Sequence, residues 1–149
     1  DLAQVLQQQW SAACINVNIE VVEEGLYYDF SNPNNYFEVE LGITGWGDRP
    51  SPQILLRQAY VAAGIETGFN ESRFSDPEVE ALVDEASRTT DDEARRAIYA
   101  QISQIFLERG PIIIPYFAPL FGGLRDSVQG LTMAPFPGLT DFRTVSISG

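Results

Sequence analysis

The sequence predicts an α/β domain, because two-residue alternation and 3.6-residue periodicity occur in turn along the chain. Apolar and polar residues alternate over 15–21 and again over 37–43, as in strands with one buried face. Helical stripes follow, one through Val79, Leu82, Val83 and Ala86 and another over 94–106. No internal repeat or linker divides the 149 residues, so we expect a single domain over 1–149.

The first third of the chain combines one helix with two strands. Residues 1–13 carry apolar side chains at helical spacing and are predicted to form an amphipathic helix. Strand 15–21 follows, then a short helical turn over 26–30 within an Asn-rich stretch, and then strand 37–43, which leads into Gly45-Trp46-Gly47. The prolines within 48–52 cannot donate to a sheet, so this segment is predicted to be a loop.

The middle of the chain is predicted to be helical. A helix opens at Ser51 or Pro52, and residues 61–72 look irregular. Capping boxes at 75–78 and 90–93 begin two further helices, and Gly110-Pro111 ends the second of them. The remainder is predicted to be mostly extended, with a strand buried on both faces at 112–114 and short strands at 121–124, 128–133 and 142–147.

Composition excludes several classes of function. Nine Lys+Arg against 21 Asp+Glu give a net charge of −12, which disfavours nucleic acids and anionic lipids, and no apolar run is long enough to span a bilayer. Histidine is absent, which removes His-based catalytic triads and His-ligated metal sites. The single cysteine, Cys14, is expected to be a small apolar filler. We therefore expect no catalytic residue, no metal and no cofactor.

The candidate ligand-binding residues surround the tip of the second predicted strand. Trp46 lies between Gly45 and Gly47 at a strand end, where ligands tend to bind in α/β sheets, although a core aromatic is the alternative. Asp48 and Arg49 follow in the proline-stiffened loop. They form either a solvated turn or a charged edge of the site, where the arginine fork would hold a carboxylate.

Aromatic and acidic clusters give weaker signals. Tyr27 and Tyr116 could line a pocket with other rings, although such stripes are usually core. The acidic groups at 76–78 and 91–93 stand at predicted helix N-termini, so capping explains them better than a metal or an acid/base pair.

The order of these motifs resembles the C-terminal lobe of the peptide/nickel class (family 5) of bacterial extracellular solute-binding proteins of ABC transporters. The resemblance covers almost the whole chain. The residues that carry it are Ala3-Gln4-Val5-Leu6-Gln7, Gly45-Trp46, Phe74-Ser75-Asp76-Pro77-Glu78-Val79, Arg95-Arg96 with Tyr99, Pro111-Ile112-Ile113-Ile114-Pro115 and Val128-Gln129-Gly130-Leu131.

This resemblance implies a lobe of the periplasmic-binding-protein type II, with a mixed sheet flanked by helices, in a fragment of a larger two-lobed protein. It implies a receptor and not an enzyme, which captures a peptide-like or other small polar solute between its lobes. The partners would be that solute, the N-terminal lobe of the same protein and the permease subunits of the importer, in a periplasmic or extracytoplasmic location. In this family the tryptophan matched by Trp46 walls the cleft.

Two positions depart from the family pattern. Cys14 stands where relatives commonly have glycine, so either it costs on the order of 1 kcal/mol at positive φ or the turn is built differently. Arg49 stands three residues after Trp46, where peptide binders often carry an aspartate for the ligand's amino terminus. This favours an acidic or zwitterionic ligand.

Two other functions remain open at this point. A regulatory protein could use the same lobe as a ligand-sensing domain, which a DNA-binding or kinase segment in the full gene would indicate. A carboxylate-pair hydrolase could use Asp48, but the sequence supplies no second acid at a defined spacing.

Overall fold

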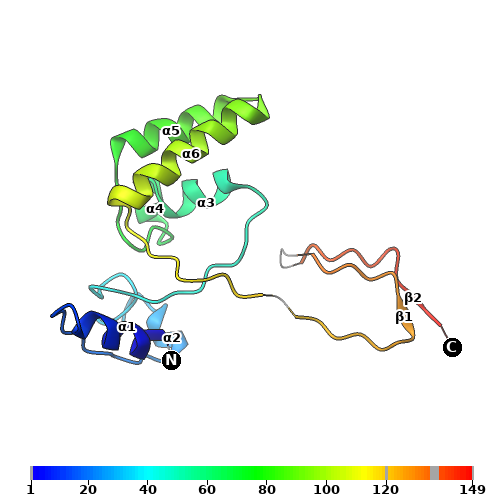
Figure 1. Cartoon of the computed structure of the whole chain (residues 1–149), viewed down its shortest axis with the longest axis horizontal. Helices are drawn as coiled ribbons and strands as arrows, with labels where there is room; N and C mark the ends of the chain where they lie inside the picture. Colours follow the sequence, from blue (N-terminus) through cyan, green and yellow to red (C-terminus); the bar gives the residue numbers. More distant parts are fainter. Residues whose placement is uncertain (1, 120, 135–137, 149) are drawn as a thin grey trace. The chain divides into compact units, whose positions relative to one another are not determined.

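The computed structural model describes residues 2–119, 121–134 and 138–148. The chain divides into two compact units, Asp1–Gly45 (unit 1) and Trp46–Gly149 (unit 2). Both units carry helices, and unit 2 also carries the paired strands (Figure 1). Among the described residues, no helix combines the length and the apolar character needed to cross a membrane.

Unit 1 contains α1 (Leu2–Ser11) and α2 (Glu24–Tyr27). The predicted first helix is confirmed, and it ends in a turn where the backbone N–H of Ile15 donates to the carbonyl of Trp10 at 2.9 Å. Cys14 completes this turn with φ of 62°, so the left-handed conformation is kept without a glycine. Its side chain is exposed, and the expectation of an apolar filler was therefore wrong.

The two strands predicted in unit 1 do not form in the described residues. Residues 15–21 have no regular secondary structure, and residues 36–41 are turns and bends. A strand requires a neighbour for its backbone N–H and C=O groups, and the alternating pattern alone supplies none. Three of the four alternating apolar side chains of the first segment, Ile15, Ile19 and Val21, are consequently exposed, and Val21 is 91% accessible.

Unit 2 is built around four helices, α3 (Pro52–Ala59), α4 (Ala63–Glu66), α5 (Pro77–Arg88) and α6 (Asp92–Arg109). Helices α5 and α6 lie side by side, and α3 packs against α5 (Figure 1). The predicted helices are confirmed, whereas α4 falls in the segment predicted to be irregular. The buried core consists of Leu56, Ala59, Tyr60, Val79, Val83, Ala86, Ile98, Ile102 and Ile105.

Burial raises the pKa of the Tyr60 phenol to about 12, with a smaller contribution from Glu71.

Carboxylates cap both long helices, as the sequence predicts, although each cap lies one residue later than the capping boxes suggest. Asp76 accepts from the backbone N–H groups of Glu78 and Val79, at 2.9 and 3.2 Å, and Asp91 accepts from that of Ala94 at 2.7 Å. Gly110 ends α6 in an extended conformation and not a left-handed one. A glycine is needed at position 110 for another reason, because a Cβ there would lie 2.4 Å from the carbonyl oxygen of Phe106.

An ion pair joins the two ends of the α5–α6 hairpin. Arg109, at the end of α6, donates to Asp76 at 2.8 Å and to Glu78 at 2.6 Å. The hydrogen bond from Arg109 lowers the pKa of the Asp76 carboxyl. Asp76 therefore serves both as a helix cap and as a partner for the neighbouring helix.

The described residues contain one pair of strands, β1 (Val128–Gln129) and β2 (Ser146–Ile147), which run antiparallel with Val128 opposite Ile147. This confirms parts of two predicted short strands. The predicted strands at 112–114 and 121–124 are unpaired, and Ile113 and Ile114 are exposed where burial on both faces was predicted. The described residues thus form a mixed structure of helices and few strands, which agrees with the predicted combination of the two, and the larger sheet flanked by helices stays a prediction.

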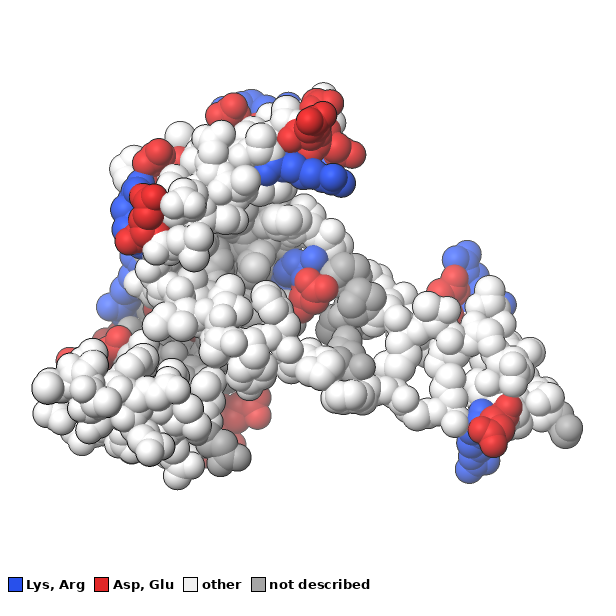
Figure 2. All heavy atoms as spheres, viewed as in Figure 1, with Lys and Arg blue, Asp and Glu red and all other residues white. Residues whose placement is uncertain are grey.

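All nine basic residues, which are arginines, lie in unit 2, whereas the acidic residues are divided between the two units. On the face shown in Figure 2, acidic and basic atoms lie close together over α5 and α6, while the surface of unit 1 is mostly uncharged. Salt bridges such as Arg57–Asp84 and Arg95–Asp92 account for part of this pattern. These exposed pairs contribute little stability each, because water screens them.

Candidate functional site

The candidate site lies in the segment that leads from Trp46 into α3. The Trp46 indole is half-buried and packs against the core of unit 2. It also contacts Phe69, with ring centroids 6.4 Å apart and planes tilted by 57°. The indole is therefore neither fully enclosed in the interior nor detached from it, and one part remains accessible.

Arg49 folds back over this tryptophan. Its guanidinium carbon lies 5.6 Å from the centroid of the Trp46 ring, within the range of a cation–π contact. Nη1 donates to the carbonyl oxygens of Gly47 at 2.9 Å and Asp48 at 3.2 Å, and Nε donates to Oε1 of Gln58 at 3.4 Å. The guanidinium plane is thus held by neutral acceptors on two sides.

The loop is stiffened by its own sequence. The carboxylate of Asp48 accepts from the backbone N–H of Arg49 at 2.8 Å, and the hydroxyl of Ser51 caps α3 by accepting from the N–H of Gln53 at 3.2 Å. Pro52 occupies the first turn of α3, where its missing donor costs nothing. The predicted loop is confirmed for 48–51, and Pro52 already belongs to α3. The hydrogen bonds of Asp48 and Ser51 restrain the loop at both ends.

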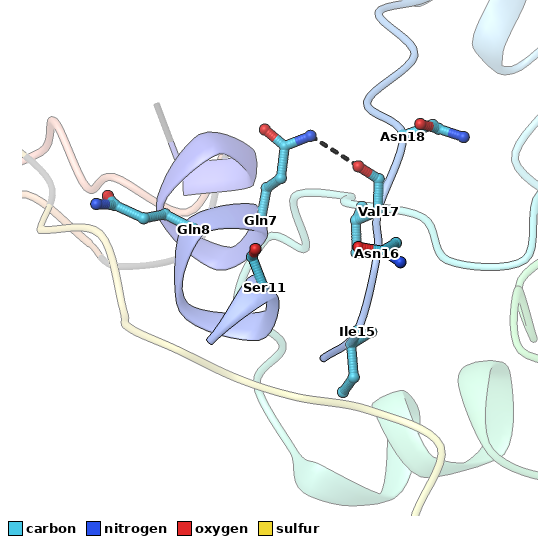
Figure 3. Close-up of a pocket in the computed structure, with 7 residues that line it drawn as sticks. All are labelled: Gln7, Gln8, Ser11, Ile15, Asn16, Val17 and Asn18. Atoms are coloured by element: carbon cyan, nitrogen blue, oxygen red, sulfur yellow. Dashed lines mark hydrogen bonds between the residues drawn. The ribbon is translucent and has the colours of Figure 1, made fainter. Parts of the chain in front are cut away.

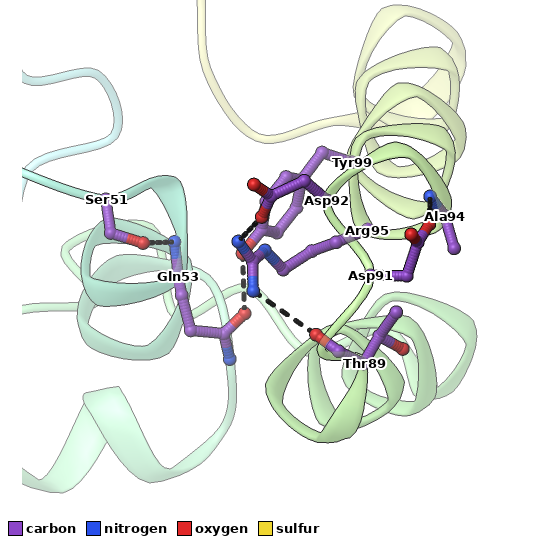
Figure 4. Close-up of polar contacts among 8 residues, drawn as sticks. All are labelled: Ser51, Gln53, Thr89, Asp91, Asp92, Ala94, Arg95 and Tyr99. Carbon is purple, nitrogen blue, oxygen red and sulfur yellow. Dashed lines mark hydrogen bonds and ion pairs between the residues drawn. The ribbon is translucent and has the colours of Figure 1, made fainter.

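Polar contacts anchor the start of α3 to the other helices (Figure 4). Gln53 accepts from the hydroxyl of Tyr99 at 3.2 Å and donates to the carbonyl of Val83 at 3.0 Å. Beside it, Arg95 donates to the carbonyl of Thr89 at 3.2 Å and pairs with Asp92. The site loop therefore leads into a helix that is held by both α5 and α6.

The glycines that flank the indole are not required by the backbone within the described residues. A Cβ on Gly45 would meet no atom within 4 Å, and neither Gly45 nor Gly47 has positive φ. A Cβ on Gly47 would lie 3.4 Å from Nη1 of Arg49, an ordinary contact. The close approach expected at these glycines is therefore not made by the described part of the chain and stays a prediction.

The other two candidate side chains are tyrosines. Tyr27 belongs to unit 1, where its ring contacts Tyr28 at 5.2 Å and Tyr36 at 5.9 Å, in a cluster that also includes Phe30 and Phe37. Tyr116 belongs to an extended segment of unit 2 and is 63% exposed. The structure brings Trp46, Gly47, Asp48 and Arg49 together, and the two tyrosines stay predicted site residues.

Two residues of the site were missed in the sequence. Gln58 lies nine residues after Arg49 on α3, and Phe69 lies between Gly68 and Asn70 in a stretch without periodicity. The helical spacing of α3 could have placed Gln58 near the loop, whereas no pattern in the sequence marks Phe69.

A separate hollow of about 560 Å³ lies in unit 1 (Figure 3). Its lining is composed of Gln7, Gln8, Ser11, Ile15, Asn16, Val17 and Asn18. Gln7 Nε2 donates to the carbonyl of Val17 at 2.7 Å across it, so this amide ties α1 to the following extended segment. The lining of the hollow includes no charged or aromatic side chain, and the hydrogen bond across it is best explained as a structural contact.

Acidic residues form no metal centre in the part of the chain that the structure describes, where no group of three or more potential ligands occurs. The carboxylates of Asp76 and Asp91 are occupied as helix caps, as the sequence predicts.

Comparison with known proteins identifies relatives over nearly the whole chain. Di/tripeptide-binding protein 4 of Pseudomonas aeruginosa is 31% identical over 146 residues, which is 97% of this chain and 27% of the relative. The dipeptide-binding protein of Escherichia coli is 26% identical over 98% of this chain and 27% of the relative, and heme-binding protein A of Haemophilus influenzae is 28% identical over 99% and 26%. The chain thus spans about a quarter of the length of these relatives. No family model and no solved structure matches the chain.

Proposed function

We propose that this chain is the C-terminal part of an extracytoplasmic solute receptor of an ABC importer. The di- and tripeptide-binding relatives confirm the resemblance to the family 5 solute-binding proteins. The observation that carries the proposal is the similarity to these relatives over 97% of the chain. The receptor would capture a peptide-like or other small polar solute and deliver it to the membrane permease. Its place of action would be the periplasm or the outer face of the membrane, and it would catalyse no reaction.

The strand patterns of the sequence support a larger lobe of the periplasmic-binding-protein type II. Residues 15–21 and 37–43 have the apolar alternation of strands, but within the described residues 15–21 has no regular secondary structure and 36–41 are turns and bends. Strands from further polypeptide, including an N-terminal lobe, would satisfy their backbone groups and cover their exposed apolar side chains. This explains why a sequence with clear strand patterns forms few strands within these residues.

The ligand would contact the face formed by Trp46, Gly47, Asp48 and Arg49. The accessible part of the half-buried indole supplies an apolar wall, and the loop supplies charges of both signs beside it. Gly45, Tyr27 and Tyr116 remain predicted ligand-binding residues. The alternative function is a ligand-sensing domain of a regulatory protein, which a DNA-binding or kinase segment in the complete gene would indicate, whereas adjoining permease genes would indicate import.

Thermal denaturation of the full-length protein tests the proposal. A panel of dipeptides, tripeptides, opines, sugars and metal chelates is added to it in separate samples. A ligand at a hundredfold excess over its Kd adds about 2.7 kcal/mol of stability, so a true ligand raises Tm visibly. A panel without any shift contradicts the proposal.

The site is tested by comparing two truncations of apolar side chains. We expect Trp46→Ala to weaken binding of the solute found in the panel, because it removes the wall of the site. Leu107→Ala, on the exposed face of α6, is the matched control and should leave binding unchanged. Equal affinities for the two variants would exclude the indole from the site.

A further inference from the structure

Among the residues that the structure describes, Arg49 is the arginine that combines partial burial with the lack of a carboxylate partner. Arg57, Arg95, Arg109 and Arg143 form ion pairs with aspartate or glutamate. Arg88, Arg96 and Arg125 have no ion pair among the described residues but are exposed, and Arg73, which is also exposed, makes further interactions. In a chain of net charge −12, a half-buried cation facing only neutral acceptors is unusual.

The acceptors around Arg49 leave one edge of its guanidinium open. Nη1 is occupied by two backbone carbonyl oxygens, at 2.9 and 3.2 Å. Nε makes only a long bond of 3.4 Å to Gln58, and Nη2 makes no hydrogen bond within the described residues. The Nε–Nη2 edge is one of the two edges by which arginine grips a carboxylate with two parallel hydrogen bonds.

The surroundings hold this edge in a fixed direction. The ring of Trp46 lies against the guanidinium at 5.6 Å, and the Gly47 and Asp48 carbonyls fix its other side. The Asp48 carboxylate is exposed and is engaged by the backbone N–H of Arg49, so it does not form an ion pair with the guanidinium. An incoming carboxylate would need to displace only the long bond to Gln58.

We propose that Arg49 is a specificity-determining residue that binds a carboxylate of the solute through its Nε–Nη2 edge. This inference rests on the proposed solute-binding function and names the substrate class, a solute that carries a free carboxylate beside an apolar group. In a short peptide this carboxylate has two sources, the C-terminus or an acidic side chain. Both present the same two oxygen atoms to the arginine.

Titration calorimetry of the full-length protein with four synthetic peptides tests the inference. Ala-Ala and Ala-Ala-amide differ in the C-terminal carboxylate, and Ala-Glu and Ala-Gln differ in the side-chain carboxylate. The wild type should prefer the acid over the amide about tenfold or more in at least one pair, and the pair that does so identifies the source. In Arg49→Gln this preference should fall to below about threefold, through loss of affinity for the acid alone.

Two further variants separate a direct contact from a general effect of charge. Arg88→Gln removes the same charge from an exposed position and should keep the preference. Arg49→Lys keeps the charge but not the fork, so its preference should lie between those of wild type and Arg49→Gln. Circular dichroism shows whether each variant is folded, and Arg49→Lys provides the decisive comparison if Arg49→Gln is not.

The possible failures are distinguishable. A wild type that binds none of the four peptides, and whose Tm none of them changes, contradicts the proposed peptide-like solute and this inference with it. A wild type that binds peptides but discriminates neither pair, or an Arg49→Gln variant that keeps full discrimination, overturns the role of Arg49 alone. An equal loss of preference in Arg88→Gln also overturns it.

Discussion

Asn70 holds the irregular segment between α3 and α5 in place, and its replacement by alanine should be among the most damaging single changes to unit 2. The residue is 0% exposed. Its side-chain amide donates to the carbonyls of Val61 at 2.9 Å and Phe74 at 2.7 Å. Its side-chain oxygen accepts from the backbone N–H of Phe74 at 3.0 Å and the hydroxyl of Ser72 at 3.2 Å. One side chain therefore closes a loop from both directions.

The magnitude follows from these four bonds. Each contributes on the order of 1 kcal/mol net, and removing one partner leaves the other without its hydrogen bond. Asn70→Ala should therefore lower the free energy of unfolding by about 3–4 kcal/mol, a large share of the roughly 5–15 kcal/mol available to a folded domain. Urea denaturation followed by circular dichroism at 222 nm measures this, because α3, α5 and α6 dominate the helical signal.

Two companion variants make the result specific to the amide. Asn16→Ala, at an exposed asparagine of unit 1, should change stability by less than about 0.5 kcal/mol. Asn70→Asp keeps the acceptor but replaces both donors with a buried charge, so at neutral pH it should destabilise at least as much as alanine. A loss below about 1 kcal/mol in Asn70→Ala would refute the closure of the loop by this side chain.

The remaining predictions concern the backbone and one ion pair. Gly64→Ala should cost about 2–3 kcal/mol, because the new Cβ would lie 2.0 Å from the carbonyl oxygen of Gln58; urea denaturation measures the loss. Cys14→Gly should raise the free energy of unfolding by about 1 kcal/mol, because φ is 62° there; a stability unchanged in the same assay would contradict the strain. Arg109 lowers the folded-state pKa of Asp76, so the resulting stability is present above the unfolded-state pKa and is lost as pH falls through the folded-state pKa. Asp76→Asn keeps a capping oxygen but not the charge, and should flatten the acid side of a plot of Tm against pH; an unchanged slope would contradict this.

The elements predicted correctly from the sequence are those whose causes are local. The stripe from Val79 to Ala86 and the acidic caps at Asp76 and Asp91 act within a few residues of one another. A helix satisfies its own backbone hydrogen bonds, so such local signals are sufficient to predict it. The short helix α4 was missed because Gly64 reads as a breaker, although its lack of a Cβ is what allows the close contact with α3.

The predicted strands failed because their partners are not local. The alternation over 15–21 indicates which side chains would be buried, but not which other segment would pair with the backbone of this strand. The candidate site also combines residues that local sequence predicts with a contact that it does not. Trp46, Asp48 and Arg49 were selected from a contiguous segment, whereas the contact with Phe69 depends on how a patternless loop is folded around Asn70.

The extended segment after α6 has a further consequence for handling the protein. From Pro111 to Leu124 the sequence carries no charge, and Phe117 is 88% exposed, which makes this stretch prone to pairing between molecules at high concentration. Prolines at 111, 115 and 119 leave runs of three residues able to donate along a ladder, 112–114 and 116–118, before the longer run 120–124. These prolines would interrupt strand pairing at every fourth residue from 111 to 119, so aggregates formed through this part of the chain should be amorphous and not fibrillar.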